Sequence, residues 1–282
     1  MGNILVVGSL CLDYYYLGEN DSPLPFPGGK GGNQAVVAKR LGAEVTLAAI
    51  VGKDPAGEFL LQNLEKDNIP TTMVLKKEAS STGHCEIQLA AQGQNVIRGF
   101  PGANLLWEPE DLERLLPLLL KADCLMLQFE IPLDYVWSLL DSAQTLGKLV
   151  ILNMGPPRQT PIPLLGENTY VVLNAQEAQF YTSIPIIDLD TAKRVATVLR
   201  KKANHVIITL GQHGALVATG RETHHVPTPD VETIDPTGAG DTFCAALAVS
   251  LLRGNCLLAA ARFACKKAAL ATTALGAQSA SP

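Results

Sequence analysis

Short apolar runs recur along this chain, and each is followed by a stretch with the periodicity of a helix. The first run, from Asn3 to Gly8, is continuous and ends at a glycine, which is typical of a strand buried on both faces. Alternation of such strands with helices predicts an α/β fold, a doubly wound and mostly parallel sheet flanked by helices. The expected strands cover 3–8, 45–50, 124–129, 149–152, 169–173 and 205–210, and the expected helices cover 35–41, 54–66, 133–146, 189–201, 238–253 and 256–273, with a further helix near 177.

Length and composition favour one large domain with an extensive core. The chain has 282 residues and no Ser- or Pro-rich linker, so we expect a single domain over residues 1–282. Hydrophobic residues make up 47% of the chain and charged residues 17%, which is enough apolar material for a large core. The segments near 71–76, 84–90 and 95–99 alternate between apolar and polar residues instead. We therefore expect a small antiparallel β lid, built from segments near 13–27 and 71–99, with one face in water.

Charge and targeting signals exclude several classes of partner. The net charge is −5 and the basic cluster at 200–202 is short, which argues against nucleic acid. No basic stretch precedes the first apolar run, and the longest apolar segments are too short to span a bilayer. We therefore expect a cytoplasmic protein without a signal peptide or a membrane partner. The six cysteines lack metal-ligand spacing and are expected to be small buried residues in a reducing compartment.

A glycine-containing motif late in the chain suggests where the chemistry lies. Gly238, Ala239 and Gly240 precede an apolar helix, so their backbone N–H groups would be free at the helix start, where anions bind. Asp241 follows, and a carboxylate there would repel a bound phosphate. Its presence is explained if it accepts a proton from an attacking group. The pattern favours phosphoryl transfer, with a simple helix cap as the alternative. It is neither a dinucleotide fingerprint, because Phe243 replaces the third glycine, nor a Walker loop, because Gly-Lys-Ser/Thr is absent from the sequence.

Four glycines surround a lysine near the start of the chain. Residues 28–34 read Gly-Gly-Lys-Gly-Gly-Asn-Gln and lead directly into a helix, which indicates close approach of the backbone to a ligand, with Lys30 and Asn33 as donors. Asp13 and Glu130 follow expected parallel strands, at the edge where open α/β sheets bind ligands. A flexible loop and a turn-forming aspartate are the alternative interpretations.

The motifs at 28–34 and 235–243 together resemble the two signatures of the ribokinase-like (PfkB) family of sugar and nucleoside kinases. The likeness runs from Val6 to about Gly276, which is nearly the whole chain. It implies ATP-dependent transfer of the γ-phosphate to a hydroxyl of a pentose or related sugar, with Mg²⁺ as cofactor and K⁺ as a further candidate. The Gly-Lys-Gly form is more similar to ribokinases than to adenosine kinases.

The resemblance also assigns residues to parts of the site. Asp241 would be the base, and the amides of Gly238, Ala239 and Gly240 would hold the charge that develops on the transferred group. The positions that match sugar contacts are Asp13, Gly29, Lys30, Asn33 and Glu130. The positions that match nucleotide contacts are Asn174, Thr209, Gly211 and Gly214, and Glu177 matches the glutamate of the family's Asn-x-x-Glu motif, which governs Mg²⁺ and phosphate. The positions that match a monovalent-cation site are Asp235, Thr237, Ala271, Ala274 and Gly276.

Four departures from the family pattern bear on specificity and assembly. Cys11 stands where ribokinases place a sugar-binding asparagine, Cys265 stands where a polar residue faces the nucleotide, and Ala280 stands where a serine completes the cation site. The segment 17–27 is shorter than the family's lid hairpin, so we expect that it hardly supplies a full two-stranded lid for a homodimer. A nucleoside kinase on the same fold is the alternative function, and a sugar or nucleotide sensor without catalysis is another. The intact Asp241 argues against the sensor.

Overall fold

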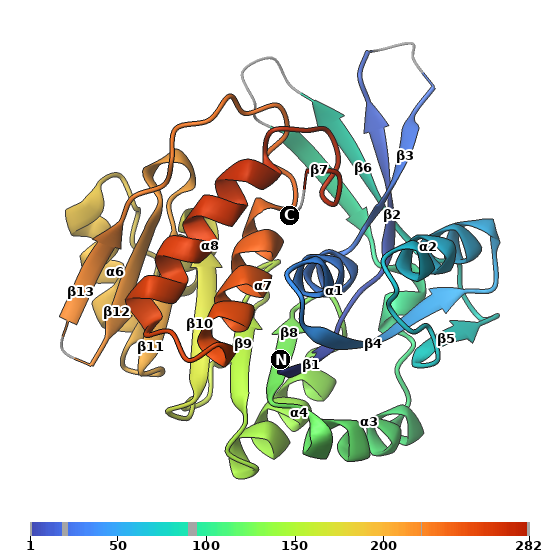
Figure 1. The fold of residues 1–282 in the computed structure, drawn as a ribbon, viewed down its shortest axis with the longest axis horizontal. Helices are drawn as coiled ribbons and strands as arrows, with labels where there is room; N and C mark the ends of the chain where they lie inside the picture. The colour runs from blue at the N-terminus through green and yellow to red at the C-terminus, as the bar shows by residue number, and fades with distance from the viewer. Residues whose placement is uncertain (1, 19–21, 90–94, 221, 281–282) are drawn as a thin grey trace.

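The computed structural model describes residues 2–18, 22–89, 95–220 and 222–280 (Figure 1). Within this part of the chain, nine strands form one sheet in the order β13-β12-β11-β10-β9-β8-β1-β4-β5. Its strands are β1 (Asn3–Val7), β4 (Glu44–Gly52), β5 (Val74–Lys77), β8 (Cys124–Gln128), β9 (Leu149–Asn153), β10 (Thr169–Asn174), β11 (His205–Thr209), β12 (Ala215–Thr219) and β13 (Glu222–Val226). All neighbours are parallel except the β11–β12 and β12–β13 pairs.

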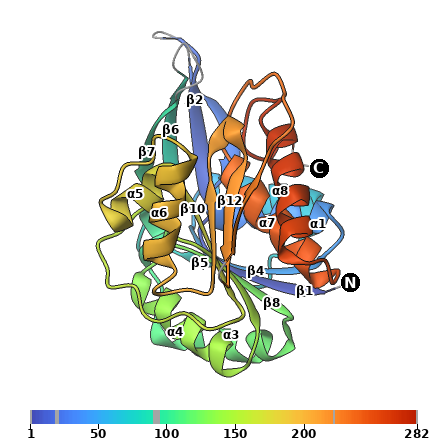
Figure 2. The same ribbon diagram turned by 90° about the vertical axis from the view of Figure 1, so that its left-hand side faces the viewer.

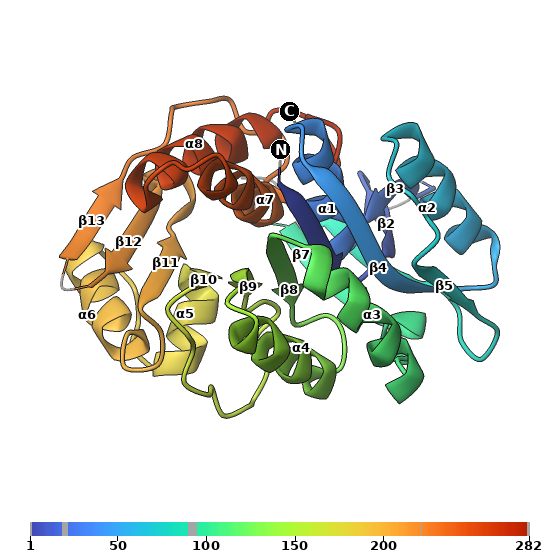
Figure 3. The ribbon, with the colours of Figure 1, turned by 60° about the horizontal axis from the view of Figure 1, so that its bottom comes forward.

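Helices cover both faces of this sheet, as Figures 2 and 3 show from two sides. One face packs against α1 (Lys30–Arg40), α2 (Pro55–Lys66), α7 (Ala239–Leu252) and α8 (Leu257–Ala271), and the other packs against α3 (Pro109–Lys121), α4 (Leu133–Thr145), α5 (Ala175–Thr182) and α6 (Leu189–Leu199). Along β1, Ile4 and Val6 enter the first core while Leu5 and Val7 enter the second. Side chains alternate across a strand, so both sets must be apolar. The predicted fold class is confirmed.

A separate four-stranded sheet stands beyond the carboxyl ends of the parallel strands, at the top of Figure 1. Its order is β3-β2-β6-β7, from β2 (Cys11–Tyr16), β3 (Leu24–Gly28), β6 (Gly83–Leu89) and β7 (Asn95–Phe100). β2 pairs antiparallel with β3 and parallel with β6, and β6 pairs antiparallel with β7. The expectation that 17–27 hardly supplies a two-stranded lid is therefore wrong, because β2 and β3 pair over five residues from Cys11↔Gly28 to Tyr15↔Leu24.

The expected antiparallel strand near 71–76 is also wrong. β5 pairs parallel with β4 at the edge of the main sheet, where it follows α2 in a β-α-β unit. β5 runs from the buried Val74 to the exposed Lys76, so it shows the same alternation of apolar and polar residues as a lid strand. The prediction also omitted α3, β12 and β13, and the short 3₁₀ helices Gly102–Leu105 and Gly211–His213. Cys256 is exposed and Cys85 half-buried, whereas the other four cysteines are buried as expected.

Helix α1 begins at Lys30, five residues earlier than predicted, because its glycines pack against the chain itself. A Cβ on Gly31 would lie 2.7 Å from the backbone of Gly8 and Ser9, and one on Gly32 would lie 2.7 Å from the Leu10 side chain. The Gly32 amide donates to the Ser9 carbonyl at 2.9 Å. These glycines let the first turn of α1 lie directly on the end of β1. In the described part of the chain, no helix is long and apolar enough to cross a membrane.

Candidate active site

The first turns of α1 and α7 meet where β1 and β8 end. Lys30 Nζ lies 3.9 Å from Asp241 Oδ1, and Asn33 Nδ2 donates to Asp241 Oδ2 at 2.9 Å. The backbone N–H of Lys30 donates to Glu130 Oε2 at 2.9 Å. The two sequence motifs are about two hundred residues apart in the chain, and the fold brings them into direct contact. The carboxyl ends of parallel strands are where open α/β sheets bind ligands.

Asp241 is 4% exposed and lies in the first turn of α7. Besides Asn33, the side chain of Gln34 donates to it, at 3.1 Å to Oδ1. The carboxylate thus has one hydrogen-bond donor on each oxygen and an ammonium nearby. Because each carboxylate oxygen has two lone pairs, acceptor capacity remains on both oxygens.

The start of α7 has the geometry of an anion cradle. Gly238 adopts a left-handed φ of 78°, and a Cβ on it would lie 2.6 Å from the Ala277 Cβ. A Cβ on Gly240 would meet no heavy atom within 4 Å, so the backbone is open on that side. The Ala239 amide donates to the Pro236 carbonyl at 3.2 Å, so it is partly used. Within the described residues, the amides of Gly238 and Gly240 have no acceptor, and they can bind an anion.

Lys30 and Glu130 are in direct contact beside Asp241. Glu130 accepts hydrogen bonds from the Ser9 hydroxyl and from the Lys30 amide. Burial alone would lower the pKa of the Lys30 ammonium, but the Asp241 and Glu130 carboxylates outweigh burial and raise that pKa. Lys30 is therefore charged at neutral pH, and it can neutralise negative charge between Asp241 and the cradle.

Asp13 lies on β2 and is 4% exposed. Burial, followed by the repulsion of Glu130, raises the pKa of this carboxyl to about 8. Its Oδ1 atom has no hydrogen-bond partner among the described residues. A Cβ on Gly28 would overlap Asp13 Oδ2, so the glycine makes room for this carboxyl. A buried acceptor without a donor fits a ligand hydroxyl.

Two other residues predicted to bind sugar serve the chain's own structure. Gly29 caps α1 with a φ of 84°, and a Cβ there would lie 2.7 Å from the Cys11 amide nitrogen. Asn33 donates to Asp241 and accepts from Gln278 Nε2 at 3.0 Å. Both polar groups of Asn33 therefore have partners inside the chain.

The residues predicted to contact nucleotide line the ends of β10 and β11. Asn174 caps α5 and forms a reciprocal pair with Glu177, with two bonds of 2.8 Å. The register pairs Asn174 with Thr209, whose hydroxyl donates to the Leu173 carbonyl at 3.4 Å. Gly211 has a φ of 57° and open space around it. Gly214 is instead explained by packing, because a Cβ at this position would overlap the carbonyl oxygen of Val226.

Asp235 anchors the segment before the anion cradle. Its carboxylate accepts from the Tyr15 hydroxyl at 2.8 Å and from the amides of Thr237 and Gly276 at 2.9 Å each. Burial would raise the pKa of Asp235, but these hydrogen bonds together lower it, so the group is an anion at neutral pH. Ala271 ends α8 and Ala274 lies in the segment that leads to Gly276. Among the described residues, no cluster of three or more His, Cys, Asp or Glu could hold a metal ion.

Sequence reasoning missed several residues that hold this site together. Tyr15, Gln128 and Gln278 are buried and bond to site residues or their neighbours. Gln34 follows Asn33 directly, so the glycine motif could have indicated it. The other three lie outside both motifs and gave no local signal.

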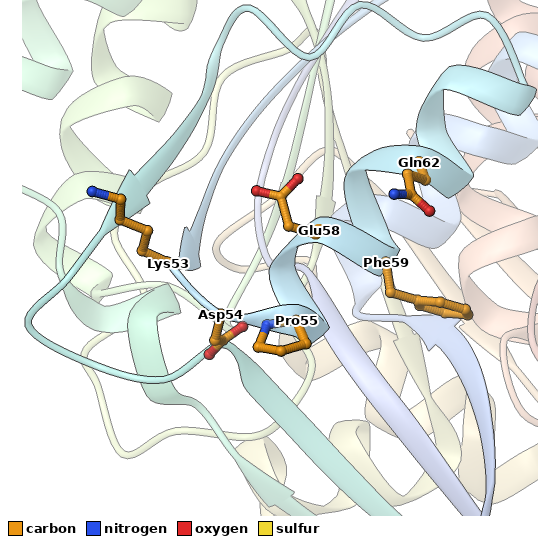
Figure 4. Close-up of a pocket in the computed structure, with 6 residues that line it drawn as sticks. All are labelled: Lys53, Asp54, Pro55, Glu58, Phe59 and Gln62. Carbon is orange, nitrogen blue, oxygen red and sulfur yellow. The ribbon is translucent and has the colours of Figure 1, made fainter.

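Two surface pockets lie away from these residues. One is lined by Gln176, Gln179, Phe180 and Ser183 on and after α5. The other lies beside the start of α2 and is lined by the six residues drawn in Figure 4. Its charged groups bond within the chain, for example Lys53 to Glu78 and Glu58 to Lys76. Neither pocket contains a predicted site residue.

Comparison with known proteins decides the family. A model of the pfkB family carbohydrate kinases matches residues 1–282. The chain belongs to this family. Ribokinase from Staphylococcus aureus (strain COL) is 32% identical over 259 residues, which cover 91% of this chain and 85% of that protein. Deoxyribokinase from Salmonella typhi is 33% identical over 257 residues, which cover 90% of this chain and 84% of that protein.

Solved structures agree with this assignment. The structure of Arabidopsis thaliana ribokinase complexed with ribose and ATP superposes with a TM-score of 0.87 at 28% identity, covering 100% of this chain and 96% of that one. The resemblance to the ribokinase-like family is thus confirmed. As a pfkB carbohydrate kinase, the protein is a phosphotransferase that acts on a sugar hydroxyl, and its family uses ATP with a metal ion.

The raised pKa of the buried Asp13 carboxyl predicts how the free energy of unfolding depends on pH. Its pKa is about 8 in the folded protein and about 3.9 in an unfolded chain, so between these values the native state binds more protons. The free energy of unfolding should therefore fall as pH rises through that window, by about 1.4 kcal/mol per pH unit for this group. Asp13→Asn should remove this slope, as measured by urea unfolding at pH 5 and pH 7.5.

The matched control is Asp134→Asn, which changes an exposed carboxylate on α4. It should leave the slope as in the wild type. If the free energy of unfolding of Asp13→Asn depends on pH as steeply as that of the wild type, Asp13 is not a buried carboxyl with a raised pKa.

Proposed function

We propose that this protein is an ATP-dependent kinase that phosphorylates a hydroxyl of a pentose or related sugar, with Asp241 as the base. The observation that carries this proposal is the placement of a buried carboxylate beside an open helix start with two unused amides. A sensor would need neither group. The names of the relatives, ribokinase and deoxyribokinase, support a pentose as acceptor.

In the proposed reaction, Asp241 accepts the proton of the attacking sugar hydroxyl. The Gly238 and Gly240 amides hold the negative charge that develops on the transferred group, and Lys30 neutralises part of it. Asp13 orients the sugar by accepting a hydrogen bond from a sugar hydroxyl on its unpartnered Oδ1. Glu130 fixes the start of α1 through the Lys30 amide, which keeps Lys30 near Asp241.

The nucleotide and its metal fit the other side of the site. Bound ATP supplies the phosphoryl group, and bound Mg²⁺ would shield its charge. We propose that Asn174, Thr209 and Gly211 border the nucleotide, since they lie together at the ends of neighbouring strands. Glu177 is buried beside Asn174 at the start of α5, and its carboxylate would orient hydrated Mg²⁺.

Replacing the base tests the central claim. Asp241→Asn keeps the size and polarity of the side chain and removes the proton acceptor, so kcat should fall by about 10² to 10⁴. The KM values for ATP and sugar should change only a few fold. Initial rates of ADP release, with pentoses, hexoses and nucleosides as acceptors, provide the measurement.

Asp111→Asn is the matched control, because Asp111 is also buried but caps α3 away from the site. It should retain the wild-type kcat. If Asp241→Asn keeps more than a tenth of the wild-type kcat, Asp241 is not the base.

A thiol faces the sugar side of the small sheet. Cys11 and Asp13 are two residues apart on β2, so both side chains point to the same face. A hydrogen bond with Cys85, burial and nearby carboxylates raise the pKa of Cys11, which keeps it a neutral thiol. Asn104 Nδ2 lies 3.5 Å from the Cys11 sulfur, but this amide also bonds to the Leu10 and Pro101 carbonyls. The wall at Cys11 is therefore weakly polar.

A weakly polar wall should discriminate little against a missing hydroxyl, since a thiol neither gains nor loses a strong hydrogen bond. We expect 2-deoxyribose, or another sugar that lacks one hydroxyl, to be accepted nearly as well as ribose. Cys11→Asn should increase discrimination in kcat/KM by about 5- to 30-fold. The exposed Cys256→Asn is the control and should leave the ratio unchanged. Rejection of all deoxy sugars by about 10³-fold in the wild type would contradict this expectation.

A monovalent cation is proposed beside Asp235, together with backbone groups of Ala271, Ala274 and Gly276. Asp235 is a buried anion, and Ala280 provides no hydroxyl to complete such a site. We therefore expect only modest activation by K⁺ over Na⁺ at fixed ionic strength. Rates that are equal in the two salts and unaffected by Asp235→Ala would remove the cation from the proposal.

A further inference from the structure

Two chains of buried side-chain amides converge on Asp241. In the first, Gln128 Nε2 donates to Gln34 Oε1 at 2.7 Å, and Gln34 Nε2 donates to Asp241 Oδ1 at 3.1 Å. In the second, Gln278 Nε2 donates to Asn33 Oδ1 at 3.0 Å, and Asn33 Nδ2 donates to Asp241 Oδ2 at 2.9 Å. Each carboxylate oxygen of Asp241 is therefore the end point of its own chain.

The charge of Asp241 sets the direction of both chains. An ionised carboxylate can only accept hydrogen bonds, so Asn33 and Gln34 must turn their NH₂ groups toward it. Their carbonyl oxygens then face away and require donors, which Gln278 and Gln128 provide. Every amide thus donates toward Asp241, and hydrogen bonds in such a series polarise one another.

Stability alone does not explain these glutamines. Gln34 and Gln128 are 0% exposed and Gln278 is 6% exposed, and a buried amide costs free energy wherever a polar atom lacks a partner. In the described part of the chain, Gln128 Oε1 has no donor, and it fills the space that a Cβ on Gly8 would occupy. The Gln128 NH₂ group nevertheless points to Gln34. This arrangement serves the amide chain at the expense of the buried oxygen.

We propose that Gln34, Gln128 and Gln278 are positioning residues that hold the Asp241 carboxylate in the orientation in which it accepts the proton of the attacking hydroxyl. This inference rests on the proposed role of Asp241. Gln34 acts by direct contact, Gln128 through Gln34, and Gln278 through Asn33. The three come from α1, β8 and the segment after α8, so the orientation of one side chain is fixed from three parts of the fold.

A positioning role has a signature that general loosening of the fold lacks. A misoriented base slows the chemical step, so kcat falls while the KM values stay near those of the wild type.

The experiment compares Gln34→Met, Gln128→Met and Gln278→Met, each close in size to glutamine, together with the double variant Gln34→Met/Gln128→Met. We expect Gln34→Met to lower kcat by about 10- to 100-fold, because it removes a hydrogen bond to a charged group. Gln128→Met and Gln278→Met should lower kcat by about 3- to 10-fold. Since Gln128 acts through Gln34, Gln128→Met should have no further effect in the Gln34→Met background.

Gln144→Met is the matched control. Gln144 lies on α4, far from Asp241, and its side chain accepts a hydrogen bond from the Gly166 amide, which the substitution removes. It should leave kcat and the KM values unchanged. A wild-type kcat in Gln128→Met, KM values in Gln34→Met that change as much as its kcat, or equal effects of Gln128→Met in both backgrounds would each overturn the inference. If Asp241→Asn is inactive and the glutamine variants are unaffected, only the inference about the glutamines is wrong. If Asp241→Asn is active, the proposed role of Asp241 as the base is wrong as well. If Gln34→Met does not fold, Gln128→Met and Gln278→Met decide by the same signature, a lower kcat with KM values near those of the wild type.

Discussion

Close contact between the first turn of α1 and the end of β1 is the constraint on which the site depends. Gly31 lies on the backbone of Gly8 and Ser9 at distances that leave no room for a Cβ. This contact places Lys30 and Asn33 within reach of Asp241. Asp241 lies on another helix, α7, late in the sequence. A larger side chain at Gly31 would push α1 away from β1 and separate Lys30 and Asn33 from Asp241.

The fold leaves the charges of the site unbalanced. Burial and the repulsion of Glu130 and Asp241 raise the pKa of Asp13, while the attraction of Asp241, Glu130 and Glu177 raises that of Lys30. A cluster of buried carboxylates is unfavourable for folding but suits chemistry in which a hydroxyl loses a proton while phosphate charge is held by amides. Functional sites are where such local conflicts with stability are expected.

Sequence patterns predicted the parallel strands well, because a strand with two buried faces must be apolar at nearly every position, as in β1 and β8. They failed where an element lies at an edge, as β5 does, since edge and lid strands alternate alike. The motifs indicated Asp241, Lys30 and Asn33 through their family likeness. The buried partners outside the motifs had no local signal. Gln278 and Asn33, for example, are 245 residues apart in sequence and meet only in the folded chain.

The hydrogen bond from Tyr15 to Asp235 joins the small sheet to the segment that leads into α7. Tyr15 belongs to the small sheet, whereas Asp235 begins the turn that ends in Gly238. If the small sheet swings outward to admit a sugar, it must either break this bond or pull the turn with it. In that case, entry of the proposed acceptor and the position of the amides proposed to hold the phosphoryl group are mechanically coupled.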